Sequence, residues 1–397
     1  MPANISNVNT DVGFVQAATL LNSVVQQATG KASATATRTE GFISQAQTLL
    51  KMGVDPVLNA LSTVLSKTIF SIRPYAGKWL GLQRDSVQWG NHVRKISFGS
   101  GGVEDIEKYD LTDGQAIDMQ KVKKPPVIQM NWYSRDSYQD HFTIFDDQLF
   151  GSLQSPEDWM RFVSGVTTEV SNKHNQYREN FARATMMNLI GSTANDGRVR
   201  HLLTEYATEY GIYVEDTTTP DPTAVLPTHL DSFVKWLFAQ IKVLSDKMEQ
   251  RSVLYHKSLD GIDLYRHTPK AMQRLYILSE FMAKVDAQVL STVFNPSYLN
   301  IGQREDVAFW QSIESPDVVN VIPSQIYANG QYRDGDAYNG HVLGILMDWE
   351  AAGVTQINEY MAPAPHNVAG RYTTTWYSCE MRGYNDMSEN AVVLALD

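Results

Sequence analysis

The stretch of sequence that decides the fold begins at Ser155, ends at Ile190 and reads SPEDWMRFVSGVTTEVSNKHNQYRENFARATMMNLI. Its large apolar residues recur at steps of three, four and seven; they are Trp159, Phe162, Val163, Val166, Val170, Tyr177 and Phe181. This spacing predicts one long amphipathic helix. A serine cap, a proline in the first position and two acids in the first turn predict its start. We expect it to end near Gly191, after on the order of 50 Å at ~1.5 Å per residue.

The segment before this helix predicts a long hairpin that projects from the body. Gly99-Ser100-Gly101-Gly102 and Asp113-Gly114 are turn signals, and Pro125-Pro126 blocks a helix. Residues 103–124 between these signals are polar and charged, whereas residues 127–133 read as a strand. An ordinary cluster of surface loops is the alternative interpretation.

The N-terminal segment, residues 1–55, predicts an arm that becomes ordered against a neighbour. Phe14, Ala18, Leu21 and Val25 could line one face of a short helix, and residues 30–37 are low in complexity and expected to be flexible. Asp55-Pro56 then opens a further predicted helix.

The second half of the chain mixes predicted helices and strands, which makes the fold class α+β. Residues 217–222 are rich in turn formers and form the best candidate domain boundary. Two helices are expected next, one with Phe233, Trp236, Leu237 and Ile241, the other with Met272, Leu275, Tyr276, Leu278 and Phe281. Strands are expected at 318–322, at 342–347 and at the all-apolar chain end, 391–396. A buried terminal strand implies that the chain returns to an earlier core.

Composition excludes several classes of function. The 397 residues carry a net charge of −11 without a basic stripe, which argues against sequence-specific binding of nucleic acid. Charged residues make up only 19% of the chain, so either much of the surface is buried against partners or it is simply polar. The one cysteine, Cys379, excludes a disulfide within the chain. The sequence shows neither a signal peptide nor a membrane-spanning run of residues, so we expect a cytoplasm-like compartment or a particle assembled there.

A search for catalytic motifs finds none. The chain has no His-Glu-x-x-His pair, no phosphate-binding loop and no Gly-x-Ser-x-Gly elbow. We therefore predict no catalytic residues, no cofactor and no metal. The adjacent acids Asp146-Asp147 and Glu104-Asp105 could serve a glycoside hydrolase, but a turn or the start of a helix is the favoured role.

Four segments carry a resemblance to a known family. They are HFTIFDDQL at 141–149, the helix with Phe162-Val163-Ser164, residues 282–290, and the chain end at 388–393. Together, and in this order, they resemble the major capsid proteins of small, short-tailed, protein-primed phages. The resemblance implies the capsid fold that tailed phages share with herpesviruses.

The resemblance also implies a division of the chain. Residues 1–55 would form the N-terminal arm, 56–92 the start of the peripheral domain, and 93–130 the extended loop. Residues 131–229 would form the peripheral domain with its spine helix at 155–190. Residues 230–340 would form the axial domain, and 341–397 would return to the peripheral domain.

The implied function is a major capsid protein that self-assembles into an icosahedral or prolate shell around the double-stranded DNA of a tailed phage. Its partners would be its own copies in hexamers and pentamers, with scaffold and portal proteins, in a virion assembled in the host cytoplasm. The expected contacts between subunits are Lys121, Lys123, Lys124, Glu104 and Asp105. The alternatives are an encapsulin-like nanocompartment shell and a carboxylate-dependent hydrolase that pairs Asp146 with a distant glutamate.

Overall fold

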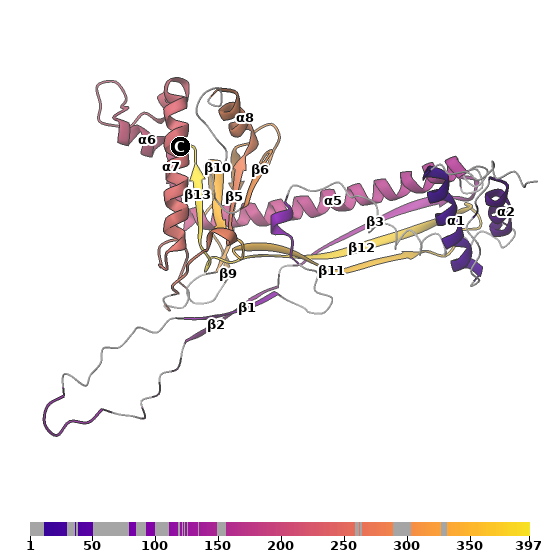
Figure 1. Ribbon diagram of the computed structural model, residues 1–397, viewed down its shortest axis with the longest axis horizontal. Coiled ribbons are helices and arrows are strands. Elements are labelled where there is room, and N and C mark those ends of the chain that lie inside the picture. Colours follow the sequence, from indigo (N-terminus) through magenta and orange to yellow (C-terminus); the bar gives the residue numbers. More distant parts are fainter. Residues whose placement is uncertain are drawn as a thin grey trace, which may run out of the picture.

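A long helix and a long sheet run side by side and form an elongated arm, which ends in a body built around a second sheet (Figure 1). This computed structural model describes residues 12–29, 36, 39–50, 79–84, 93–99, 111–117, 120, 122, 124, 126–133, 135–148, 156–258, 262, 264–288, 303–326 and 332–397. In that part of the chain helices and sheets are both abundant, so the predicted α+β class is confirmed.

The arm consists of helix α5 (Pro156–Asn195) against a three-stranded antiparallel sheet. The strand order in this sheet is β11 (Ala352–Pro363), β12 (Tyr372–Asn385) and β3 (Asp136–Phe145). Helix and sheet meet through apolar and aromatic side chains; for example, the rings of Tyr138 and Tyr177 stack at 4.6 Å. The predicted long helix is confirmed, and at ~1.5 Å per residue it is about 60 Å long.

The helix ends later than the sequence predicts. Gly191 lies within the helix and does not end it. The glycine is needed here because another segment comes close: a Cβ at this position would lie 2.6 Å from Val321 Cγ1. The helix ends at Asn195, and Gly197 follows it with a φ of +75°, which suits glycine. The amides of Gly197 and Arg198 bond the carbonyls of Ala194 and Thr193, which is the Schellman pattern.

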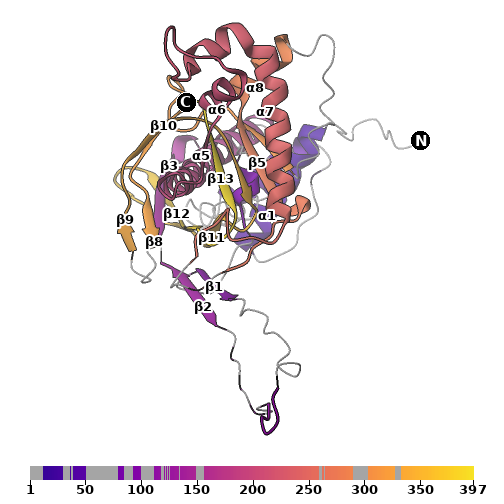
Figure 2. The same ribbon diagram turned by 90° about the vertical axis from the view of Figure 1, so that its left-hand side faces the viewer.

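The body is built on a six-stranded sheet among the described residues. Its order is β4 (Val199–His201), β13 (Ala391–Ala395), β10 (Tyr338–Asp348), β5 (Gln273–Leu278) and β6 (Gln303–Val307), and β7 (Val318–Val321) also pairs with β10. Helix α7 (Val225–Glu249) runs along one side of this sheet, and the C-terminal end of α5 contacts β13 and β10 (Figure 2). The main hydrophobic core lies here and includes Phe233, Leu237 and Ile345.

Shorter elements complete the described fold. They are the helix α6 (Leu202–Tyr210), the 3-10 helices η1 (Leu80–Leu82), η3 (Pro222–Ala224) and η4 (Lys270–Met272), and the two-stranded sheet of β8 (Ser324–Ile326) with β9 (Tyr332–Asp334). The turn-rich residues 217–222 connect α6 to α7.

The prediction of one helix with Met272, Leu275 and Phe281 is wrong. Residues 273–278 form β5, and helix α8 (Ser279–Gln288) begins directly after it. Strand β5 lies between β10 and β6, and its last four residues are all buried. A strand buried on both faces loses the alternation that identifies strands, so its apolar run resembles a helix in sequence.

The C-terminal segment 341–397 contributes to both sheets. Strand β13 lies in the body sheet between β4 and β10, whereas β11 and β12 build the arm. The all-apolar chain end is therefore a buried strand, as expected. Its sheet contains β4 from the segment 131–229 and β5 from the segment 230–340, so strands of both segments meet in the body.

Two helices occupy the predicted N-terminal arm. Helix α1 (Val12–Thr29) packs against α5 and next to α2 (Thr39–Leu50), at the end of the arm far from the body (Figure 1). Ala18, Leu21 and Val25 are buried, as the predicted helix face requires. The N-terminal segment therefore packs against helix α5 of its own chain. The predicted helix after Asp55-Pro56 lies outside the described residues, as does most of the segment 30–37.

Candidate assembly hairpin

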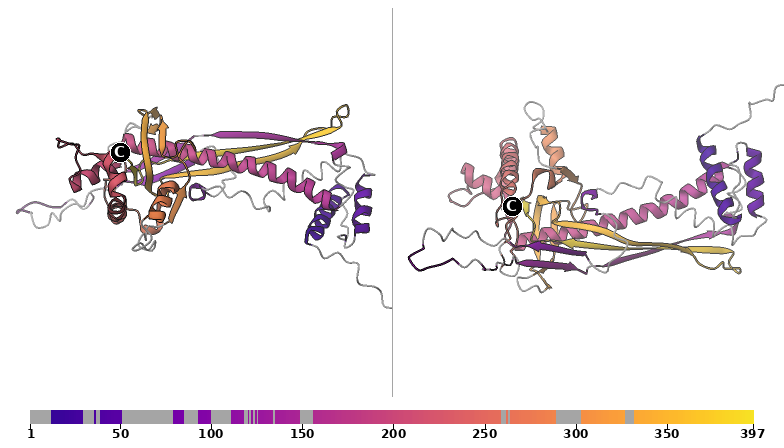
Figure 3. Two further views of the ribbon diagram at one scale, coloured as in Figure 1. Left: turned by 90° about the horizontal axis from the view of Figure 1, so that it is seen from above. Right: turned by 60° about the horizontal axis from the view of Figure 1, so that its bottom comes forward.

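A two-stranded hairpin leaves the body on the side away from α1 and α2 (Figure 3). Strand β1 (Val93–Phe98) pairs antiparallel with β2 (Val127–Trp132), from Val93 opposite Trp132 to Phe98 opposite Val127. The predicted strand at 127–133 and the pairing across the predicted loop are confirmed. The predicted turn at Asp113-Gly114 is also present: Gly114 has a φ of +91°, and the Gln115 amide bonds the Thr112 carbonyl at 3.0 Å.

One face of the hairpin is anchored on the body. Ile128, Met130 and Trp132 alternate along β2 and bury their side chains with Leu264. The Trp132 indole N–H donates to the carbonyl of Asn385 at 3.1 Å, and its ring lies 5.4 Å from that of Tyr384. The base of the hairpin is therefore held where β12 ends.

A cluster of charges fixes the same face. The Lys95 ammonium lies 2.6 Å from Glu389, 2.9 Å from Asp386 and 3.0 Å from Glu350. Arg266 lies 3.2 Å from Glu389 and donates to Ser97 Oγ at 2.8 Å, which ties it to β1. Asp386 and Glu389 are buried, so a neighbouring cation is required to hold their charges inside the protein.

The charges in this cluster are unevenly balanced. Burial by itself would lower the pKa of Lys95, but Asp386 and Glu389 outweigh that effect and hold this pKa above its usual value. Burial raises the pKa of Glu389 to about 7, although Lys95 and Arg266 act in the opposite direction. Because burial raises this pKa to about 7, Glu389 is protonated in a substantial part of the molecules at neutral pH.

The other face of the hairpin exposes apolar side chains. Phe98 is 68% exposed, Val127 54% and Ile96 45%. Further along, the described part of the loop exposes Leu111, Ile117 and Val122. A contiguous apolar surface on a projecting element is typical of a site that binds another protein.

One comparison with known proteins gives a family that spans most of the chain. The family model for the Phi29-like phage major capsid protein matches residues 19–395. The chain belongs to this family. The capsid protein is also similar to the capsid structure of Staphylococcus phage Andhra, at 9% identity and a TM-score of 0.53, over 81% of this chain and 85% of that one. A structure reported for the head fiber and inner core protein of native bacteriophage P68 gives 9% identity and a TM-score of 0.53, over 82% of this chain and 86% of that one. A search of curated proteins gives no significant match.

These findings confirm the predicted resemblance, the capsid fold and the shell-forming function. The family consists of structural proteins of the virion, and neither the nanocompartment nor the hydrolase alternative gains support from the comparisons. Among the described helices of the capsid protein, none has an apolar stretch long enough to span a membrane.

The predicted contact residues fall between β1 and β2 in the sequence. Lys124 is exposed, whereas Lys121, Lys123, Glu104 and Asp105 lie outside the described residues. The sequence did not reveal the anchor of the hairpin, because Lys95 and Glu389 are almost 300 positions apart. The one available signal was a pair of acids, Asp386 and Glu389, directly before an all-apolar strand.

Asp146, the candidate catalytic carboxylate, has contacts that give it a structural role. Asp146 is buried in the helical turn that follows β3, its amide bonds the Arg371 carbonyl at 3.0 Å, and its carboxylate lies 3.6 Å from His366. These contacts close the end of the arm sheet, which agrees with the favoured turn or helix-start role.

Proposed function

We propose that the hairpin is the main assembly element of this capsid protein and that it lies across a neighbouring subunit in the shell. The observation that carries the proposal is that one face of the hairpin is buried against the body and the other face is exposed. One face is fixed to the body by Trp132 and Lys95, whereas Phe98 and Val127 on the other face remain exposed. A second copy of the chain would cover that apolar face and gain roughly 25 cal/mol for each Å² buried.

The body and the arm would then have separate roles in the shell. The axial domain, residues 230–340 with the body sheet, would gather around the axes of hexamers and pentamers. The peripheral domain, residues 131–229 with α5, would reach towards neighbouring capsomers, and the extended loop would be residues 93–130. The length of the arm supports this division, because a helix of about 60 Å places its two ends in different neighbourhoods.

Charges on the loop would add to these contacts. Lys121, Lys123 and Lys124 would meet acidic patches of the next subunit, and Glu104 and Asp105 would meet basic ones. Each exposed pair contributes little alone, about 0–1 kcal/mol, but the contacts repeat over every subunit of a closed shell. Scaffold and portal proteins are the further partners we propose, with assembly in the host cytoplasm.

The enclosed DNA would not be gripped by sequence-specific contacts. The net charge of −11 supports this part of the proposal, because clustered cations are needed to neutralise phosphates. A weakly repelling wall would also favour release of the genome.

Deletion of residues 103–124 tests the role of the hairpin. The shortened chain should keep the circular dichroism spectrum of the full chain, because the deleted residues lie beyond β1 and β2. It should fail to form closed shells in negative-stain electron microscopy, with and without a candidate scaffold protein. Normal shells from the shortened chain would refute the assignment.

A further inference from the structure

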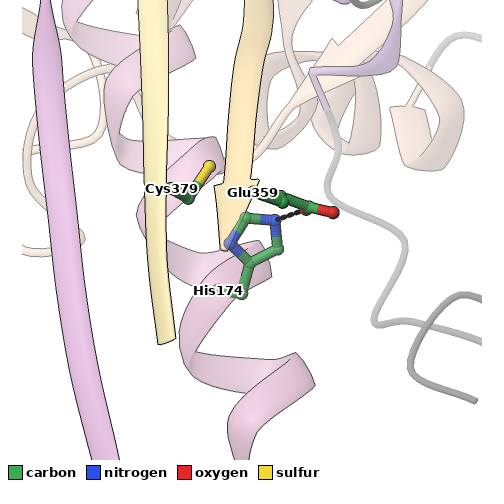
Figure 4. Close-up of side chains that lie close together, drawn as sticks. All are labelled: His174, Glu359 and Cys379. Carbon is green, nitrogen blue, oxygen red and sulfur yellow. Dashed lines mark ion pairs between the residues drawn. The ribbon is translucent and has the colours of Figure 1, made fainter. Parts of the chain in front are cut away.

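Three side chains with metal-binding atoms converge inside the arm, far from the hairpin. His174 comes from α5, Glu359 from β11 and Cys379 from β12 (Figure 4). Glu359 and Cys379 are register partners in the arm sheet, so both point to the face that α5 covers. The three donor atoms lie within 4.8 Å of one another.

The site is enclosed by the packing between helix and sheet. Cys379 is 1% exposed and His174 7%, and the Glu359 side chain is 20% exposed. Tyr377 and Met381 pack around Cys379 as a small core of their own. Glu359 is therefore the side chain that connects this interior to solvent and gives an ion a way in.

Tyr377 contacts both the histidine and the glutamate of this cluster. The Tyr377 hydroxyl lies 3.1 Å from His174 Nδ1 and 3.5 Å from His174 Nε2, and it donates to Glu359 Oε1 at 3.2 Å. Because this hydroxyl donates its proton to Glu359, its oxygen is left to accept a hydrogen bond from the nearer ring nitrogen, the Nδ1–H of His174. The lone pair of His174 then sits on Nε2, which lies 3.5 Å from Glu359 Oε1. A partner that fixes the tautomer of a histidine in this way is a common support of metal ligands.

The distance and the chemistry suit zinc. Two ligands bound at ~2.0 Å in a tetrahedral site lie about 3.3 Å apart, close to the 3.5 Å between His174 and Glu359. Imidazole, carboxylate and thiolate are all ligands of zinc, and Arg178 is the charged neighbour of His174.

We propose that His174, Glu359 and Cys379 form a zinc site that joins helix α5 to strands β11 and β12. Binding forms bonds from the ion to His174 Nε2, a Glu359 oxygen and Cys379 Sγ, with water in the fourth position. The thiol proton leaves to solvent as the sulfur bond forms. The nearby Arg178 opposes the ion, whereas the carboxylate and the thiolate together balance its two positive charges.

The ion would brace the arm at mid-length. The arm is a single helix on a single sheet, and it would transmit force between the body and the helices α1 and α2. A ligand that binds only the folded state stabilises it by about 4 kcal/mol at a thousand times its dissociation constant. Sequence inspection predicted no metal, because the three ligands lie at positions 174, 359 and 379 without a recognisable spacing.

The test uses the full chain without a polyhistidine tag, stripped with a chelator and titrated with Co²⁺ and then Zn²⁺. Since the chain has a single cysteine, a thiolate-to-cobalt charge-transfer band can arise only from Cys379. We expect one equivalent of Co²⁺ to produce this band and Zn²⁺ to remove it. Elemental analysis should then give one zinc per chain, and the thermal midpoint should rise with Zn²⁺.

Two variants and a control complete the design. Cys379→Ser should lose the charge-transfer band, and His174→Gln should weaken Co²⁺ binding at least tenfold, as expected for a lost ligand. His141→Gln is the matched control, because His141 lies on strand β3 of the same sheet, with its ring tilted against that of Trp376 at 4.7 Å, away from the site. A stripped wild-type chain that shows no thiolate band at saturating Co²⁺ would overturn the proposal, whether or not the variants fold.

Discussion

Replacing Lys95 with methionine should release the base of the hairpin from the body. Lys95 is the cation shared by Glu350, Asp386 and Glu389. Methionine keeps much of the length and apolar character of the stem but removes the charge. The variant therefore leaves acids inside the protein without their main partner.

The structure sets the magnitude of this effect. The Asp386 side chain is fully buried and that of Glu389 8% exposed, whereas that of Glu350 is 46% exposed and well solvated. Removing one partner of a buried ion pair costs about 3–5 kcal/mol. Arg266 still contacts Glu389 at 3.2 Å, so we expect the lower end of this range, about 3 kcal/mol.

Hydrogen exchange on the unassembled subunit measures this loss of stability in the hairpin itself. The amides of β1 and β2 should exchange roughly a hundredfold faster in Lys95→Met, since 1.36 kcal/mol corresponds to a factor of ten. Amides of α7 should be unchanged, because the hairpin can open without global unfolding. Arg94→Met is the control, since Arg94 is the exposed neighbour on the same strand. A change below about 0.5 kcal/mol, the range of ordinary surface substitutions, would refute the anchoring role.

Three further predictions concern the body and the arm. Gly191→Ala should lower the free energy of unfolding by about 1–3 kcal/mol, because the new methyl group overpacks against Val321. Gly165→Ala in the same helix, where a Cβ meets nothing within 4 Å, should raise it by up to about 1 kcal/mol. Chemical denaturation measures both changes. Glu389→Gln should flatten the fall in stability between pH 4.5 and 7, because burial raises the pKa of Glu389 from 4.5 to about 7 and the folded state therefore holds a proton that the unfolded chain releases. Leu21→Ala, which removes a fully buried side chain, should cost about 2–5 kcal/mol locally and expose the N-terminal helices to limited proteolysis.

Each of these predictions has a result that contradicts it. Equal stability of the Gly191 and Gly165 variants would mean that α5 does not approach Val321 closely. A slope with pH that is the same in Glu389→Gln, with Glu350→Gln as the exposed control, would place the titration elsewhere. Resistance of Leu21→Ala to protease would show that the packing of α1 does not depend on the buried Leu21 side chain.

The sequence predicted elements whose signals are local. Pro156 and the acids after it marked the start of the spine helix, and Asp113-Gly114 marked the turn of the hairpin. Gly191 misled the prediction of the helix end, because a glycine needed for close packing looks the same in sequence as one that ends a helix. The run in β5 was misread because it is buried on both sides.

Features that depend on distant residues were beyond sequence reasoning. The anchor of the hairpin joins Lys95 to Glu389, and the candidate metal site joins His174 to Cys379. Each pair is brought together only when the C-terminal strands pair with elements from the first half of the chain. The buried and the exposed face of the hairpin could be told apart only from the exposure of the side chains in the structure, whereas the sequence identified only its polar loop.

Shell formation by a pair of matched variants tests the central claim most directly. The wild-type chain, the double variant Phe98→Ser with Val127→Ser, and the control Ile313→Ser would be compared by light scattering and negative-stain electron microscopy, with and without a candidate scaffold protein. Ile313 is a 77% exposed apolar residue of the body. We predict closed shells or capsomers from the wild type and the control, and folded but unassembled subunits from the double variant. Shells from the double variant equal to those of the wild type, or a wild-type chain that stays monomeric under all conditions, would contradict the account.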